Sequence, residues 1–229
     1  MAKMSQFSFV SFALIVFATW VNADNCYPDS CNGQMHTMCL YRSPQPAPTC
    51  NEVQSAKLTP AEEREILDAH NKLRALVAAG RETRGISGPQ PAGNIPSLKW
   101  DPELAKIAQR WANQCSFGHD KCRNIPKYNV GQNVATRSRT DGHRAKLSEL
   151  VQDWYEEVKD FSNRSVPKFQ WQSWPQIGHY TQLVWGKTTS VGCGAIRYKD
   201  SEGWYTTYLV CNYGPSGNWI GEPIYQTRY

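Results

Sequence analysis

Residues 178–213, GHYTQLVWGKTTSVGCGAIRYKDSEGWYTTYLVCNY, decide the fold of this chain. They predict a histidine-bearing helical turn followed by two strands joined by a tight loop. A three-residue loop ending in Gly203 places Cys193 directly opposite Cys211, because glycine reaches the positive φ that such a loop needs. Directly opposed strand residues lie about 4.5 to 5.5 Å apart, a distance that a disulfide spans. The spacing therefore predicts a disulfide between the two strands.

Both faces of this hairpin are apolar, so both need to be covered. One face carries Val191, Cys193, Ala195, Leu209, Cys211 and Tyr213, and the other carries Ile196, Tyr198, Tyr208 and Val210. We expect helices on each side of the sheet.

Three helices are predicted from caps and apolar periodicity. The first begins at Thr59 and Pro60 and ends at Gly80, the second begins at Asp101, and the third covers 147–158. Their inner faces are formed by Ile66, Ala69, His70, Leu73 and Val77, then Leu104, Ile107, Ala108 and Trp111, then Leu147, Leu150, Val151, Trp154 and Val158. A short strand is expected over 131–135. The fold class that follows is α+β, a three-layer α-β-α sandwich with a small, mainly antiparallel sheet and four disulfides.

The N-terminus has the pattern of a secretory signal peptide over residues 1–23. Lys3 precedes an apolar run from Phe7 to Trp20, and cleavage is expected after Ala23. The run is shorter than the roughly 18 to 20 residues that a spanning helix needs, so we expect a secreted protein without a transmembrane anchor. Residues 24–58 are expected to form a disulfide-pinned extension, and 59–229 a single domain.

Cysteine usage and charge narrow the function classes. The chain has 8 Cys and no CxxC pair, which behind a signal peptide indicates disulfides in an oxidising compartment. The formal net charge of +5 is spread without a run of basic residues, so nucleic acid is not an expected partner.

Several long motifs carry a family resemblance. GHYTQLVW with VGCG, and YLVCNYGPSGNWIGEPIY, resemble the two signatures of the CAP superfamily of cysteine-rich secretory proteins, antigen 5 and pathogenesis-related 1 proteins. The stretches CNGQMHTMC, HN at 70–71, ETRG, GPQP, WANQC, GHD and VGQNVA are similar to insect venom allergen 5. This resemblance covers nearly the whole mature chain and implies a secreted, non-enzymatic allergen of venom or saliva.

The resemblance also implies a disulfide map and a cleft. The pairs are Cys26 with Cys39, Cys31 with Cys122, Cys50 with Cys115, and Cys193 with Cys211. The family's cleft tetrad of two histidines and two acids falls on His119, Gln132, Glu157 and His179. Gln132 departs from the glutamate of many members, although antigen 5 proteins share the glutamine.

The tetrad allows three hypotheses. Two imidazoles and one carboxylate are ordinary ligands for Zn or another divalent cation, although no cofactor is required. A metal-dependent hydrolase is the alternative function, but Gln132 lacks the basicity of a general base. The favoured interpretation is that His119 and His179 are polar residues that hydrogen-bond across the cleft. The other histidines, His36, His70 and His143, are not expected to bind ligands.

A binding role is expected in place of catalysis. Phe169, Trp171 and Trp174 are candidates for the wall of a lipid pocket, since CAP relatives bind sterols or fatty acids. Host proteins, including antibodies, are the other expected partners. A scaffold without any ligand is a third hypothesis. Asn163 lies in the only N-glycosylation sequon, in a loop expected to be exposed.

Overall fold

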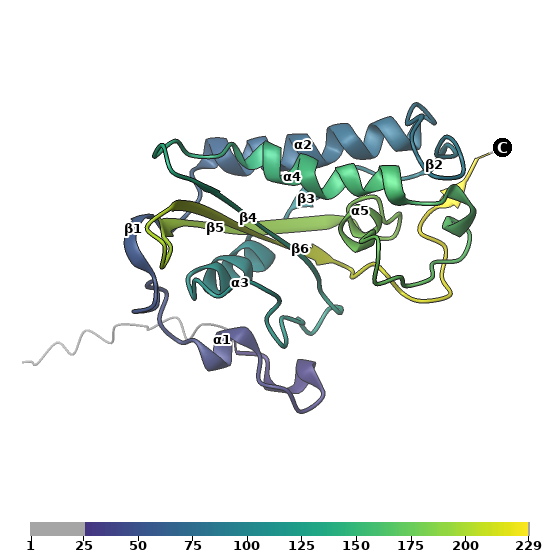
Figure 1. Cartoon of the computed structure of the whole chain (residues 1–229). Helices are drawn as coiled ribbons and strands as arrows, with labels where there is room; N and C mark the ends of the chain where they lie inside the picture. Colours follow the sequence, from purple (N-terminus) through teal and green to yellow (C-terminus); the bar gives the residue numbers. More distant parts are fainter. Residues whose placement is uncertain (1–25, 229) are drawn as a thin grey trace, which may run out of the picture.

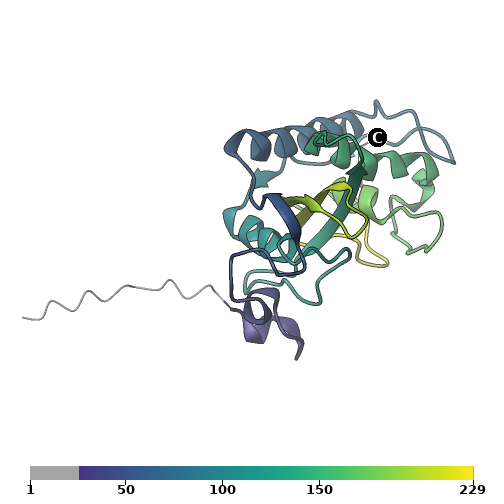
Figure 2. The same cartoon turned by 60° about the vertical axis from the view of Figure 1, so that its left-hand side comes forward.

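The computed structural model describes residues 26–228, so the expected signal peptide, 1–23, lies outside the described residues. A sheet lies between two helical layers (Figure 1). Helices α2 (Pro60–Ala78) and α4 (Leu147–Glu156) cover one face, and α3 (Pro102–Ala112) covers the other. The rotated view in Figure 2 shows the same three layers. The predicted α-β-α sandwich is confirmed.

The central hairpin has the register that the sequence predicts. Strands β5 (Ser190–Lys199) and β6 (Tyr205–Gly214) pair antiparallel with Cys193 opposite Cys211. Gly203 adopts a φ of 83° in the connecting turn. A non-glycine residue would be strained there, so the glycine fixes the register of both strands.

The sheet is larger than the hairpin pattern predicts. Its strand order is β1-β5-β6-β4, and β3 also pairs with β5. Strand β4 (Gly131–Arg139) runs beyond the expected 131–135, because β6 pairs with it as far as Arg139 opposite Tyr205. Strands β1 (Asn51–Ser55) and β3 (Lys99–Trp100) are short edge elements without alternating apolar residues, and pairing with β5 defines them. A separate ribbon joins β2 (Gly93–Asn94) to β7 (Gln226–Thr227).

Local sequence signals set the starts of the two long helices. Thr59 and Glu62 form a capping box at the start of α2, and Asp101 accepts the amides of Glu103 and Leu104 at the start of α3. Each cap satisfies backbone N–H groups that a helix terminus leaves unpaired. The third predicted helix is divided, since α4 ends at Glu156 and a 3-10 turn, η2 (Glu157–Asp160), continues it.

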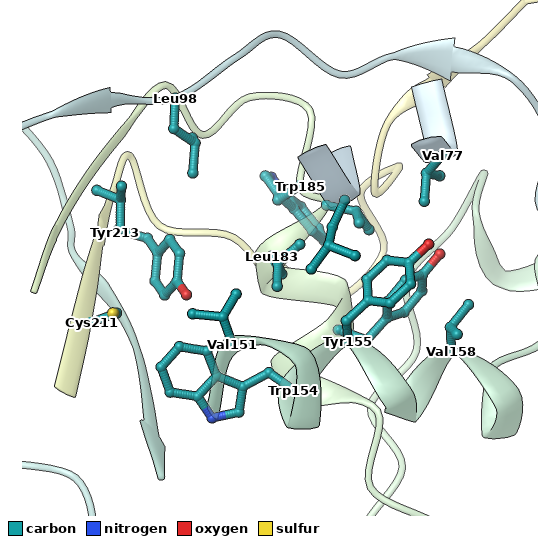
Figure 3. Close-up of a cluster of buried hydrophobic side chains, with 14 of the residues drawn as sticks. Val77, Leu98, Val151, Trp154, Tyr155, Val158, Leu183, Trp185, Cys211 and Tyr213 are labelled. Atoms are coloured by element: carbon teal, nitrogen blue, oxygen red, sulfur yellow. The ribbon is translucent and has the colours of Figure 1, made fainter. Parts of the chain in front are cut away.

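Each face of the sheet has its own core, as the two apolar faces of the hairpin require. The larger core lies between the sheet and α2 and α4, where Trp154, Tyr155 and Trp185 are almost fully buried (Figure 3). Ile196, Tyr208 and Val210 point to the other side and pack with Ala108 and Trp111 of α3. All the predicted inward residues of the hairpin lie in one of these two clusters.

Two glycines of β5 allow α3 to lie directly on the strand. A Cβ at Gly192 would stand 2.2 Å from the Ala105 nitrogen, and one at Gly194 would stand 2.2 Å from the Gln109 Cα. Neither neighbour is a movable side chain, because both are helix backbone. Gln109 completes the contact, since its side chain exchanges hydrogen bonds of 2.9 and 3.0 Å with the backbone of Ala195.

The N-terminal extension is held by cross-links and by local caps. The disulfides join Cys26–Cys39, Cys31–Cys122, Cys50–Cys115 and Cys193–Cys211, which are the pairs that the resemblance implies. The extension also contains a 3-10 turn, η1 (Pro28–Cys31), and one helical turn, α1 (Thr37–Leu40), neither of which was predicted. Such short turns show no periodicity in sequence. Among residues 26–228, no helix has the length and apolarity to cross a bilayer.

Candidate functional site

The four tetrad residues come from separate elements at one end of the sheet. His119 lies in the loop after α3, Gln132 is on β4, Glu157 is the first residue of η2, and His179 is in the first turn of α5 (Gly178–Leu183). The structure joins them as two pairs, His119 with Gln132 and His179 with Glu157. Within residues 26–228, no hydrogen bond links one histidine to the other.

The Gln132 amide has a fixed orientation. Its Nε2 donates to Asp120 Oδ1 and to Asn212 Oδ1, both at 3.0 Å. Its Oε1 is therefore the acceptor for His119 Nδ1, at 2.8 Å. Because an amide oxygen only accepts, His119 has to carry its proton on Nδ1. The Nε2 lone pair of His119 is left available.

This network accounts for an amide at position 132. Asp120 is 5% exposed and is also bound by Arg123 and by the Thr37 hydroxyl. A glutamate in place of Gln132 would set a carboxylate oxygen against the Asp120 carboxylate and the Asn212 carbonyl oxygen. Two carboxylates sharing one site repel each other and force one to take up a proton. Gln132 avoids this repulsion and is a donor in its place.

Glu157 fixes the second histidine. One carboxylate oxygen accepts from His179 Nδ1 at 2.6 Å, and the other accepts the backbone N–H groups of His179 and Tyr180 at 2.9 and 3.0 Å. The carboxylate thus caps the start of α5 and holds the imidazole, a favourable place for an anion. His179 also stacks on Trp154, with ring centroids 6.1 Å apart. Its Nε2, like that of His119, has no partner within the described part of the chain.

A buried polar chain supports the site from behind. Asn133 Nδ2 donates to the His179 carbonyl oxygen at 3.1 Å and to the Tyr213 hydroxyl at 3.2 Å. The Tyr213 hydroxyl lies 2.8 Å from His70 Nε2, and His70 Nδ1 lies 2.8 Å from the Ile66 carbonyl oxygen. Only one arrangement satisfies every group: His70 donates from Nδ1 and accepts at Nε2. As expected from sequence, His70 is a satisfied core histidine.

Burial governs the titration of these histidines. Removal of water lowers the pKa of His70 from 6.5 to about 4, and the nearby Arg74 guanidinium acts in the same direction. The pKa of His119 is also lowered, first by loss of water around the ring, against the hydrogen bond with Gln132. Both groups are therefore held neutral at pH 7.

The chemical capacity of the site is limited. The Nε2 atoms of the two imidazoles are suitable donors for a divalent cation. The carboxylate of Glu157 is already used by His179 and Tyr180, and residues 26–228 contain no group of three or more His, Cys, Asp or Glu side chains able to hold a metal ion. The residues thus fit an open, two-histidine site that water would complete. They do not fit a closed structural site.

Of the three aromatic candidates for a lipid pocket, Phe169 and Trp171 lie together edge-to-face, with ring centroids 6.4 Å apart. Phe169 is fully buried in the larger core and packs edge-on against Trp185. Trp171 and Trp174 are 58% and 86% exposed. Aromatic character alone does not separate a core ring from a surface ring, so this distinction could not be predicted from the sequence.

The sequon residue Asn163 takes part in the fold. Its Nδ2 donates to the carbonyl oxygens of Ser87 and Pro89, at 3.3 and 2.8 Å. A glycan on this nitrogen would leave one N–H for two acceptors, so a modified Asn163 would lose one of these contacts. Whether the sequon is used stays a prediction.

Sequence reasoning missed the polar residues that hold the tetrad. Asp120, Asn133 and Asn212 fix Gln132 and His179, yet none belongs to the expected site. Asp120 directly follows His119 in the GHD stretch, which was the one available signal. Asn133 and Asn212 are polar positions on strands, and only the register of β4 opposite β6 reveals their neighbours.

Comparisons with known proteins agree with this architecture. The family model described as CAP, the cysteine-rich secretory protein family, matches residues 67–213. Venom allergen 3 of Solenopsis invicta is 48% identical over 94% of this chain and 99% of its own length. Venom allergen 5 of Microctonus hyperodae is 45% identical over 98% and 100%.

Solved structures show the same fold. The structure of BmVAL-1 matches with a TM-score of 0.65 and 33% identity, over 77% of this chain and 87% of that one. The structure of NaASP2 with Zn2+ matches with a TM-score of 0.59 and 26% identity, over 80% and 90%.

Proposed function

The chain belongs to the cysteine-rich secretory protein (CAP) family, and we propose that it is a secreted venom or salivary protein of the allergen 5 type that acts by binding. The observation that carries this proposal is the sequence identity of 45 to 48% between this chain and venom allergens, over nearly the full length of both chains. Allergenicity in a stung or bitten host follows from that likeness.

The tetrad supports binding in preference to catalysis. Hydrolysis requires a positioned base, and the amide of Gln132 has no useful basicity. Glu157 is occupied by three donors from α5. All 8 Cys are in disulfides, which removes thiols as nucleophiles.

The proposed ligand is a small lipid, a sterol or fatty acid, or a host protein. The test is extraction of protein purified from a eukaryotic secretion host, followed by mass spectrometry of the extract and a sterol and fatty-acid uptake assay on the stripped protein. Bound or re-bound lipid supports the small-ligand form of the proposal. An empty protein that takes up neither class would overturn that form.

A second candidate function is the reversible binding of a divalent cation between His119 and His179. The free Nε2 atoms of the two fixed imidazoles favour it, and one structural relative is described with Zn2+. Zinc should raise the melting temperature of the wild type through linkage, and His119→Ala and His179→Ala should remove the effect. His143→Ala, at an exposed loop histidine, is the matched control.

The hydrolase alternative makes a stricter demand. Peptide or ester turnover would have to depend on zinc and disappear in His179→Ala while persisting in His143→Ala. Absence of a thermal shift in saturating zinc would eliminate both the cation site and the hydrolase.

A further inference from the structure

A groove of about 480 Å³ lies between the N-terminal extension and the start of the His119 loop. We call it the extension groove. It is lined by Gln34, Met35, Thr37, Leu40, Tyr41, Trp111, His119, Asp120 and Lys121. Its volume falls in the range of roughly 300 to 1,000 Å³ typical of small-molecule sites. Figure 1 shows that α1 of the extension and α3 lie on the side of the sheet away from α2 and α4.

The apolar part of the groove is open to solvent. Met35 and Leu40 are 59% and 51% exposed. The groove is also lined by the half-buried Tyr41 and by Trp111, which is 8% exposed, and the centroids of their rings are 5.9 Å apart. The Trp111 indole N–H is already satisfied by the Gly118 carbonyl oxygen at 2.8 Å. The accessible part of the Trp111 ring therefore presents no unpaired donor to an apolar molecule in the groove.

The extension cannot close over this surface. Cys39 and Cys31 attach α1 and its preceding turn to Cys26 and Cys122. Thr37 adds a backbone hydrogen bond of 2.8 Å to the Cys122 carbonyl oxygen. Exposed apolar side chains normally collapse onto a nearby apolar surface. Here the cross-links hold α1 and the turn before it in place while Met35 and Leu40 stay exposed, so the groove is pre-organised.

One end of the groove is polar and carries an unpaired positive charge. Lys121 is exposed and, within residues 26–228, has no ion pair. Asp120 is the only acid lining the groove, and Arg123 neutralises it. His119 lines the same end, with Nδ1 used by Gln132 and Nε2 free. An anionic head group placed here meets a cation and no uncompensated acid.

We propose that the extension groove binds a small amphiphile with an apolar body and a single anionic head group, the body on Tyr41 and Trp111 and the head at Lys121. The inference rests on the proposed binding function and gives it a site. That site is not the Phe169–Trp174 stretch expected from sequence. Met35 is suited to the role, because a flexible thioether adapts to apolar molecules of different shape.

The test uses two fluorescent probes with the same aromatic body. 8-Anilinonaphthalene-1-sulfonate carries an anionic group, and N-phenyl-1-naphthylamine does not. Both are titrated into the full chain with its disulfides intact. Leu40→Ser should raise the Kd of both probes about tenfold, the loss of one partly buried leucine contact. Lys121→Glu should raise the Kd of the sulfonate about tenfold and leave that of the neutral probe unchanged.

Trp174→Ser is the matched control, because it removes a larger exposed apolar side chain from another face. Melting curves of all variants exclude unfolding as the cause of lost binding. The groove is refuted if Leu40→Ser and Lys121→Glu bind both probes as the wild type does, or if Trp174→Ser alone lowers affinity. Lipid recovered by extraction would in that case preserve the proposed function. A wild type that binds neither probe and yields no lipid would refute both.

Discussion

Mild acid should destabilise the protein through His70. This side chain is fully buried and its pKa is lowered from 6.5 to about 4, while in the unfolded chain it regains its ordinary pKa. Between these two values the unfolded state binds a proton that the folded state does not. The free energy of unfolding from this group is therefore complete above pH 6.5, falls as the pH falls, and levels off below about 4.

The size of the effect follows from the two pKa values. At ~1.36 kcal/mol per pH unit, a pKa lowered from 6.5 to about 4 corresponds to about 3 kcal/mol in total, of which about 2 kcal/mol is lost by pH 5. That is a large share of the roughly 5 to 15 kcal/mol that stabilises a typical domain. The main physical cause is the complete burial of the imidazole, which penalises its charged form, and the Arg74 guanidinium acts in the same direction.

Urea unfolding at pH 7.5 and pH 5.0, with disulfides intact, measures how much of the free energy of unfolding is lost through His70. The wild type is compared with His70→Gln, which does not titrate in this range, and with His143→Gln as a control at an exposed histidine. His70→Gln should be less stable at pH 7.5 but lose about 2 kcal/mol less than the wild type on acidification. His36 also has a lowered pKa, but it is present in all three proteins and adds the same loss of stability on acidification to each. If the wild type and His70→Gln lose the same free energy, His70 is not held neutral in the fold and the reasoning is refuted.

Three further predictions concern other parts of the fold. Gln132→Glu should lower the free energy of unfolding at pH 7 by about 1 to 3 kcal/mol, because the new carboxylate is repelled by Asp120. Near pH 4 protonation relieves this repulsion, so part of the lost stability should return. A variant as stable as the wild type at pH 7 would contradict the hydrogen bonds assigned to Gln132. Arg74→Met should lower the free energy of unfolding, measured in urea, by about 3 to 5 kcal/mol. The buried guanidinium donates to four backbone carbonyls, those of Pro96, Leu183, Trp185 and Thr188. Arg81→Met, at an exposed arginine, should change the free energy of unfolding little. Gly194→Ala should lower the melting temperature or abolish secretion, because the added Cβ meets the backbone of α3. In the control Gly33→Ala no atom lies within 4 Å of the added Cβ, so that variant has only the cost of its positive φ. Equal stability of the two variants would show that α3 does not pack directly on β5.

The elements that the sequence predicts well are those whose signals are local. The Cys193–Cys211 register depends on a short turn with Gly203, and the start of α2 depends on Thr59 and Glu62, three residues apart. Both signals lie within a few residues of the structure they determine. The same holds for the alternating faces of β5 and β6, which separate the two cores.

The features that could not be predicted depend on contacts distant in sequence. Strand β1 exists because β5 offers an edge, and its own residues are mostly exposed. The tetrad positions came from resemblance, but the roles of Asp120 and Asn212 follow from how β4, β6 and the His119 loop meet. The extension groove likewise requires the placement of α1, which two disulfides determine.

The positions of the disulfides make the effect of a single proteolytic cut depend on where it falls in the chain. Three bridges lie within residues 26–122 and the fourth joins 193 to 211, so no bridge spans the chain between 122 and 193. A single nick in the loop between α2 and β3 leaves its two ends tied through Cys31–Cys122 and Cys50–Cys115. A nick near Asp141 leaves two pieces that no disulfide joins. Strand pairing (β1 and β3 with β5, β4 with β6, β2 with β7) and helix packing hold them together, so they would separate on denaturation without any reducing agent. Digestion would therefore begin to release separate peptides from the 123–192 segment while the extension is still covalently attached to Cys115 and Cys122.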